Sequence, residues 1–173
     1  MGEKVHILRI MAVTVTLVVG ADGSTSKNGN SAGVSSAADR SAFLARRRSA
    51  DCILIGGNTA RTEPYHRTPV PVIVLSRNLI NPLADNRLAH CWNLSPSKAI
   101  EKAGKTFGPN IHVEAGISII EELMTANLID CLELSITQVT GGSDFIDVTK
   151  LLSHFPHSTE FTESGTRFIS AHK

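Results

Sequence analysis

The sequence lacks the cysteine and histidine patterns that would cross-link a fold by disulfides or by a bound metal ion. Its 173 residues include three cysteines, Cys52, Cys91 and Cys131, which are far apart and odd in number. They provide neither a disulfide framework nor a Cys-x-x-Cys metal clip. The seven histidines also lack the spacing of a His-Glu-x-x-His zinc motif. The sequence therefore predicts a reducing, cytoplasmic setting and no metal.

An excess of charge of either sign is also missing. With 17 basic and 16 acidic residues the formal net charge is +1, so no overall field attracts a polyanion and we expect no nucleic-acid partner. The apolar stretch over residues 7–19 is interrupted by Arg9 and is too short to cross a bilayer, so we expect no membrane partner. Hydrophobic residues at 42% are typical of a globular protein. We expect one domain over residues 1–173, with its core over about residues 11–170.

Apolar, β-branched runs recur along the chain, with helical patterns between them. The predicted strands cover residues 11–19, 52–55, 70–75, 111–114 and 132–137. The predicted helices cover residues 37–48, 97–105 and 117–126, with a helical turn over 146–152 and an antiparallel pair over 160–170. This alternation is typical of βαβ units. It predicts an α/β fold with a mainly parallel central sheet and an antiparallel C-terminal edge.

A long polar segment over residues 21–36 follows the first predicted strand. It ends where Ser36, with Asp39 three residues later, resembles a capping box that starts the first helix. Long loops in compact domains are commonly functional. Ligands of open α/β sheets bind at the carboxyl ends of the strands, which is where this loop lies.

Three glycine-containing junctions, over residues 20–23, 56–59 and 115–118, also follow predicted strands. Each provides a turn, and at a helix N-terminus free N–H groups can hold phosphate. None is a Walker A loop or a Gly-x-Gly-x-x-Gly fingerprint. Ser76-Arg77 follows another strand and suits a phosphate monoester. Two purely structural alternatives stay open. In one the glycines only end strands, and in the other Arg77 is a solvated loop residue.

Several motifs, in this order, carry a family resemblance. They are the Asp22-Gly23 turn, the segment 51–59 (Asp-Cys-Ile-Leu-Ile-Gly-Gly-Asn-Thr), Glu63-Pro64, and the segment 113–116 (Val-Glu-Ala-Gly). From about residue 13 to 155 the chain resembles the reductase domain of bacterial riboflavin biosynthesis, a relative of dihydrofolate reductase. The resemblance implies a dihydrofolate-reductase-like three-layer sandwich and a homodimer. Residues 129–136, with Phe145 and Ile146, are the candidate interface.

The resemblance implies a site shared by NADPH and a phosphoribosylamino-pyrimidine, as in 5-amino-6-(5-phosphoribosylamino)uracil reductase. On the cofactor side it implies Val19, Gly56, Thr59, Glu63, Ser76, Arg77, Ala115, Gly116, Ile117, Ser118, Ile119 and Ile120. On the substrate side it implies Asp22, Ser31, Arg47, Arg67 and Glu114, with the two arginines suited to the phosphate. Glu63, with Glu114 and Asp22 behind it, is the candidate catalytic acid, a role in which a carboxyl needs a pKa raised by burial; delivery of the proton by water stays open as the alternative.

Two other functions stay open. One is a different dihydrofolate-reductase-like enzyme that reduces a pterin or another imine or carbonyl compound. The other is a nucleotide-binding protein without catalysis, which Ala115 in place of a glycine and Gly33 in place of an aromatic residue would favour. The zinc-deaminase signature, His-x-Glu with Pro-Cys-x-x-Cys, is missing from the sequence, so we expect a stand-alone reductase.

Overall fold

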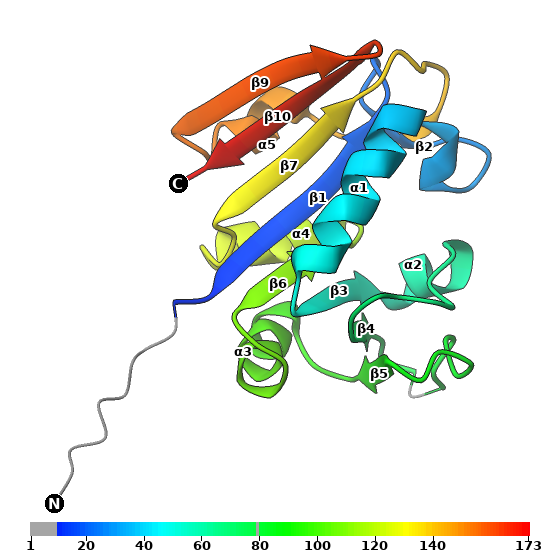
Figure 1. Ribbon diagram of the computed structural model, residues 1–173, viewed down its shortest axis with the longest axis vertical. Helices are drawn as coiled ribbons and strands as arrows, with labels where there is room; N and C mark the ends of the chain where they lie inside the picture. The colour runs from blue at the N-terminus through cyan, green and yellow to red at the C-terminus, as the bar shows by residue number, and fades with distance from the viewer. Residues whose placement is uncertain (1–9, 79) are drawn as a thin grey trace, which may run out of the picture.

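The computed structural model describes residues 10–78 and 80–173, and an eight-stranded sheet lies at its centre (Figure 1). The first three residues of the apolar stretch 7–19 lie outside this part. In chain order the elements are β1 (Ala12–Val19), β2 (Ser24–Ser26), α1 (Ala37–Ser49), β3 (Cys52–Gly56), α2 (Gly57–Thr62), β4 (Val72–Leu75), β5 (Ala89–Trp92), α3 (Pro96–Thr106), β6 (Asn110–Val113), α4 (Ile117–Thr125), β7 (Cys131–Ile136), β8 (Ser143–Phe145), α5 (Val148–Leu152), β9 (His157–Glu163) and β10 (Thr166–His172).

The strand order is β5-β4-β3-β6-β1-β7-β10-β9. Neighbours from β5 to β7 pair in parallel, and β10 pairs antiparallel with both β7 and β9. The mainly parallel sheet with an antiparallel C-terminal edge is therefore confirmed. The expected interface segment is wrong in part: β7 lies between β1 and β10, so it offers no free strand edge to a second copy.

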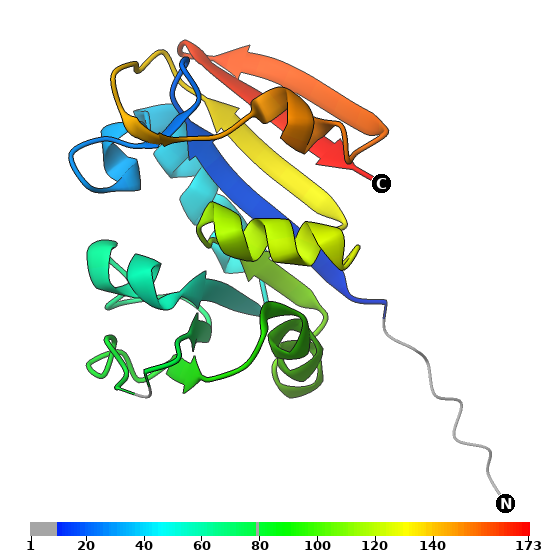
Figure 2. The same ribbon diagram turned by 180° about the vertical axis from the view of Figure 1, so that it is seen from behind.

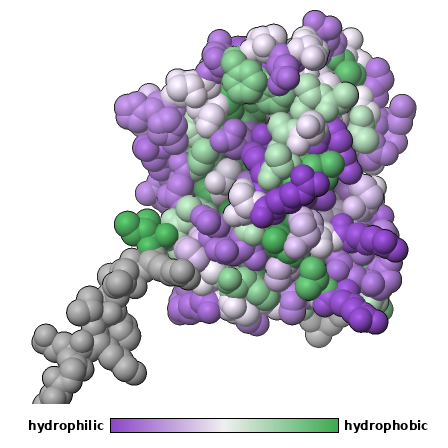
Figure 3. All heavy atoms as spheres, in the orientation of Figure 1, coloured by the Kyte–Doolittle hydropathy of each residue, from purple (hydrophilic) through white to green (hydrophobic). Residues whose placement is uncertain are grey.

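Helices cover the two faces of the sheet unequally. Helix α1 crosses one face, while α3, α4 and α5 lie on the other, which gives three layers (Figures 1 and 2). Alternate side chains of β3 enter two apolar cores: Leu54 packs on the side of α3 and α4, and Ile53 packs with Tyr65 and Leu83 on the opposite side. Many hydrophilic side chains lie on the face that α1 crosses (Figure 3).

Helix α1 begins as its sequence predicts, because Ser36 Oγ accepts a hydrogen bond from the Asp39 backbone N–H at 3.0 Å. In a full capping box the Asp39 side chain would also accept a hydrogen bond from the Ser36 backbone N–H, and this second bond is replaced. The Asp39 carboxylate accepts instead from Ser35 Oγ at 2.5 Å.

Four elements, α2, β2, β5 and β8, went unpredicted because each is short. Helix α2 has six residues and starts with Gly57-Asn58, so it lacks an apolar period. Strand β5 has four residues. Strand β2 lies inside the segment 21–36 and pairs with β8, so this segment is a small ribbon rather than a structureless loop.

Candidate active site

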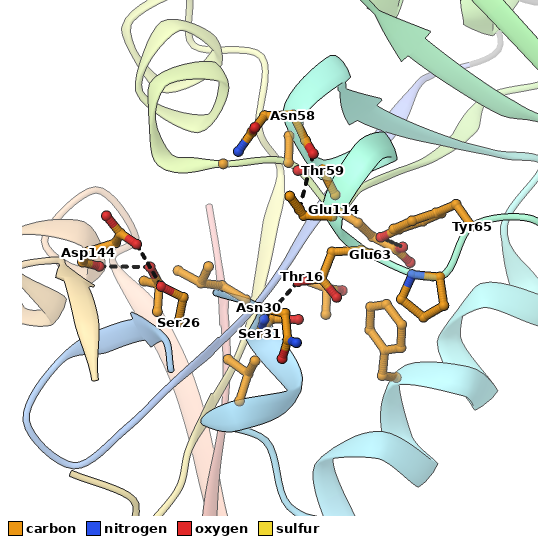
Figure 4. Close-up of a pocket in the computed structure, with 18 of the residues that line it drawn as sticks. Thr16, Ser26, Asn30, Ser31, Asn58, Thr59, Glu63, Tyr65, Glu114 and Asp144 are labelled. Atoms are coloured by element: carbon orange, nitrogen blue, oxygen red, sulfur yellow. Dashed lines mark hydrogen bonds between the residues drawn. The ribbon is translucent and has the colours of Figure 1, made fainter. Parts of the chain in front are cut away.

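A cleft of about 440 Å³ opens at the carboxyl ends of β1, β3 and β6 (Figure 4). The segment 25–31 and residues 143–144 of the β2–β8 ribbon line one side, α2 lines another, and α1 lines a third. A second hollow of about 410 Å³ adjoins it and shares Val18, Ser31, Phe43 and Glu63. The expected position of the site, beside the loop after the first strand, agrees with this geometry.

A buried ion pair forms one wall of the cleft. Arg47 of α1 donates to Glu114, just after β6, through Nε at 3.0 Å and Nη2 at 2.7 Å. Tyr65 Oη donates to Glu114 Oε2 at 2.7 Å. Arg47, Glu114 and Tyr65 are 5%, 6% and 4% exposed. A buried charge survives only when it is paired and hydrogen-bonded, and here both charges are.

Burial and this pairing perturb the ionisation of the cluster. Burial by itself would lower the pKa of Arg47, but the hydrogen bonds and charge of Glu114 hold it above its usual value. Burial, aided by the neighbouring Glu114 charge, raises the pKa of Tyr65 well above its usual value. The Arg47 guanidinium also lies 4.2 Å from the Phe43 ring centre and 4.5 Å from that of Tyr65. The charge of Arg47 is therefore compensated by Glu114, which argues against its expected role toward a substrate phosphate.

Glu63 and Ser31 are hydrogen-bonded to each other between α2 and the ribbon segment, residues 25–31. Glu63 Oε1 accepts a hydrogen bond from the Ser31 backbone N–H at 2.7 Å, and both residues line both hollows. A short 3-10 helix, Ser31–Gly33, holds Ser31 in place. Gly33 is needed here because a Cβ would overlap the backbone carbonyl oxygen of Lys27. Packing against the backbone therefore explains the absence of an aromatic residue at this position.

Thr16 lies on β1 in the middle of the cleft, between Ser31 and Glu114 in Figure 4. Its side chain is buried, with 7% of the residue exposed, and Oγ1 has no hydrogen-bond partner in the described part of the chain. Buried hydroxyls in native proteins nearly always have a partner. Sequence reasoning missed Thr16 because a threonine in a β-branched strand looks like an ordinary strand residue.

The N-terminus of α4 faces the cleft. Gly116 caps this nine-residue helix without a side-chain hydrogen bond, and Gly116 and Ile117 line the cleft and are exposed. The N–H groups of Ile119 and Ile120 already bond to the Gly116 carbonyl, so those of Ile117 and Ser118 are the ones the helix leaves free. A Cβ added to Gly116 would meet nothing within 4 Å. Ala115 lines the cleft, and Ile119 packs against the core.

The structure places other expected cofactor residues differently. Val19 is 0% exposed and packs in the core, whereas Val18, one residue earlier, lines the cleft. Ile120 is also fully buried. The expected role of the Val19 side chain at the nicotinamide is therefore corrected, because alternate strand residues face opposite sides. Thr59 lines the cleft, and Gly56 lies beneath it against Ile119.

On the substrate side, Asp22 and Arg67 are not among the residues that line the cleft. Asp22 accepts hydrogen bonds from Ser24 Oγ at 2.6 Å and from the Gly141 backbone at 2.7 Å, and the Ser24 bond holds its pKa below its usual value. It stabilises the turn before β2, and its expected contact with substrate stays a prediction. Arg67 is exposed.

Ser76 and Arg77 follow β4, outside the cleft. Ser76 Oγ and Arg61 Nη1 both lie about 3.3 Å or less from the point where a Gly57 Cβ would be. Arg77 is exposed. Arg61 is thus a further cation beside the expected phosphate position, and it was missed because α2 was missed.

The cleft-lining residues that sequence reasoning missed include Thr16, Val18, Asn30, Arg40, Phe43, Asn58, Tyr65 and Asp144. Among residues 10–78 and 80–173, no three His, Cys, Asp or Glu side chains gather closely enough to hold a metal ion. Over the same residues, every helix is too short or too polar to cross a membrane.

The fold and cleft define a three-layer α/β ligand-binding domain whose site lies at the carboxyl edge of a mainly parallel sheet. The RibD C-terminal domain model matches residues 11–146, and the chain belongs to this family. A search of the curated proteins by sequence finds no match.

Solved structures agree on the fold. The chain is similar to a deaminase/5-amino-6-(5-phosphoribosylamino)uracil reductase of Thermotoga maritima, with a TM-score of 0.67, 13% identity, and coverage of 94% of this chain and 56% of that one. For Acinetobacter baumannii RibD the values are 0.71, 13%, 94% and 58%. For the riboflavin biosynthesis reductase Rib7 of Saccharomyces cerevisiae they are 0.64, 14%, 94% and 90%. The chain therefore spans just over half the length of the first two proteins.

Proposed function

We propose that the protein is an NADPH-dependent reductase that reduces an aminopyrimidine of the kind found in riboflavin biosynthesis, 5-amino-6-(5-phosphoribosylamino)uracil or a close relative. One observation carries the proposal: a helix N-terminus suited to a pyrophosphate and a polar floor suited to a heterocycle lie in one cleft. The family and the activities of two similar proteins agree with it.

The residues at one end of the cleft fit a dinucleotide. The exposed Gly116 and Ile117 offer backbone N–H groups at the positive end of α4, and Thr59 and Asn58 flank them. Open space at Gly116 allows the close approach of a phosphate group. Ala115 does not obstruct the phosphate end of the cleft, because Ala115 is only 6% exposed and packs with the core. We propose that Ser76, Arg61 and Arg77 hold the adenosine 2′-phosphate, since guanidinium groups pair well with phosphate.

When bound, NADPH supplies the hydride, and the chain's own residues align the substrate and exclude water. Phe43 and Val18 line both hollows and offer apolar surface for a ring. The Glu63 carboxylate accepts from the Ser31 backbone N–H and lines both hollows. We propose that it keeps Ser31 over the substrate and holds a proton-donor position there.

Arg40 replaces Arg47 and Arg67 as the proposed cation for a substrate phosphate. It is exposed and lines both hollows, whereas Arg47 is neutralised by Glu114 and Arg67 lies outside. Loss of activity in Arg40→Ala with a phosphorylated pyrimidine, but not with its dephosphorylated form, would support this assignment. Equal loss with both would favour the other reductase class, which acts on a pterin or a similar ring.

We also propose a homodimer in a reducing, cytoplasmic setting. Strand β9 is the edge strand beyond β10, and all seven of its residues are exposed, including Phe161. Pairing of two such edges is a common route to a two-fold dimer. Size-exclusion chromatography with light scattering tests it, and a monomer at micromolar concentration would contradict it.

The first experiment for the enzyme is a titration with NADPH and, separately, with NADH, followed by nicotinamide fluorescence. We expect micromolar NADPH binding that weakens at least about tenfold for NADH, a difference of about 1.4 kcal/mol. Arg77→Ala should remove most of that difference without changing NADH binding. If neither nucleotide binds, the reductase proposal fails and a binding protein without catalysis becomes the better account.

A further inference from the structure

The floor of the cleft contains one hydroxyl that the protein itself leaves without a partner. Thr16 Oγ1 is buried, unpaired among the described residues, and belongs to a side chain that lines the cleft. A second buried orphan, Ser135 Oγ, lies on the adjacent strand β7 but does not line the cleft. Both hydroxyl oxygens are buried, and of the two residues only Thr16 lines the cleft.

Thr16 and Glu114 are neighbours on the same face of the sheet. Val15 pairs with Val113 in the parallel register of β1 and β6, so the next residues, Thr16 and Glu114, lie side by side. Figure 4 places both at the same cavity. A ligand that contacts the floor meets these two side chains together.

Glu114 has little hydrogen-bonding capacity left for a ligand. Arg47 Nε is within 3.1 Å of both its oxygens, and Oε2 also accepts from Arg47 Nη2 and Tyr65 Oη. Thr16, in contrast, has one O–H donor and two acceptor lone pairs unused. Rotation about χ1 to another staggered rotamer moves Oγ1 to the position of Cγ2 and Cγ2 to that of Hβ, so the hydroxyl can turn to the cleft without moving the backbone.

We propose that Thr16, rather than Glu114, is the residue of the floor that binds the polar edge of the substrate ring. The hydroxyl is neutral and can both donate and accept, which suits the alternating carbonyl and amino groups of an aminopyrimidine and does not suit a phosphate. This assignment rests on the proposed reductase function and names the part of the substrate that reaches the floor.

The variants Thr16→Val and Thr16→Ser test the assignment. Valine keeps the shape and removes the hydroxyl, whereas serine keeps the hydroxyl. Ser135→Ala is the matched control, because it removes the other orphan hydroxyl from outside the cleft. For each protein we would measure the midpoint of thermal unfolding without ligand, the Kd of NADPH, and the Kd of 5,6-diaminouracil by calorimetry with saturating NADP⁺.

Thr16→Val should raise the unfolding midpoint by about 2–4 °C, because an unpaired buried polar group is removed. It should weaken 5,6-diaminouracil about tenfold and leave the Kd of NADPH within about twofold of the wild-type value. Thr16→Ser should bind the ring like the wild type. Ser135→Ala should raise the midpoint similarly and leave both Kd values unchanged.

Two results would overturn the assignment while the reductase proposal stands. One is wild-type NADPH binding together with equal affinity of Thr16→Val and wild type for 5,6-diaminouracil. The other is an equal loss of ring affinity in Thr16→Ser and Thr16→Val, which would indicate a packing effect. If the wild type binds neither NADPH nor the uracil, the proposed function fails and the assignment fails with it.

Discussion

Replacement of Arg47 by methionine should be among the most damaging single changes in this protein. Methionine fills a similar volume but leaves the Glu114 carboxylate, whose side chain is 3% exposed, without its counter-charge. Removing one partner of a buried ion pair costs about 3–5 kcal/mol. A domain of this size is stable by about 5–15 kcal/mol, so the loss is a large part of the total. The unfolding midpoint should fall by about 6–20 °C.

A double-mutant cycle separates the pair from simple packing. Arg47→Met/Glu114→Gln removes both charges and keeps an acceptor for the Tyr65 hydroxyl, so it should recover part of the loss. We expect a coupling energy of about 1–3 kcal/mol, measured by urea unfolding of the four proteins. An exposed ion pair would give about 0–1 kcal/mol for the single loss. A single-variant loss in that range, or no coupling, would refute the view that the pair is buried and intact.

Three further predictions follow from particular contacts. Because the pKa of Tyr65 is raised in the fold, the unfolded chain loses that proton first as pH rises, so stability should fall above about pH 10 and the fall should be smaller in Tyr65→Phe. Gly33→Ala should destabilise the fold by about 1–3 kcal/mol, because the added Cβ overlaps the Lys27 carbonyl; urea unfolding checks it. Glu63→Gln keeps an acceptor for the Ser31 N–H, whereas Glu63→Ala does not. Hydrogen exchange at the Ser31 amide should therefore accelerate in the alanine variant alone, and a large fall in kcat in Glu63→Gln would identify proton donation as its role.

The fold was predictable because its signals are local. The runs over β1, β3, β4, β6 and β7 are apolar and β-branched, and Ser36 marks the start of α1 within its own turn. Helix α2 and strands β2 and β8 depend instead on contacts with distant segments, as in the pairing of Ser24 with Phe145. Such short elements have too few residues to set a period, so tertiary contacts decide them.

The site was predictable as a region and less so residue by residue. Motif order identified Thr59, Glu63, Ser31 and Gly116, which do line the cleft. Successive residues of β1 face opposite sides of the sheet, so only one of Val18 and Val19 can reach the cleft. A motif does not show which of the two it is. Arg47 looked like a free cation because its partner, Glu114, is 67 residues away in the chain.

Such long separations in sequence also explain why the cleft depends on the completed fold. Its walls are joined by hydrogen bonds between residues 67, 49 and 32 positions apart, from Arg47 and Tyr65 to Glu114 and from Ser31 to Glu63. None of these contacts exists until α1, β6 and the ribbon segment have packed on the sheet, so the cleft is a product of the completed fold rather than of any single motif. The protein pairs the buried Arg47 and Glu114 charges with each other and leaves the Thr16 hydroxyl of the cleft without a partner among the described residues. The groups free to recognise a ligand are therefore neutral ones on the floor and backbone N–H groups at α4, with Arg40 as the exposed cation beside them.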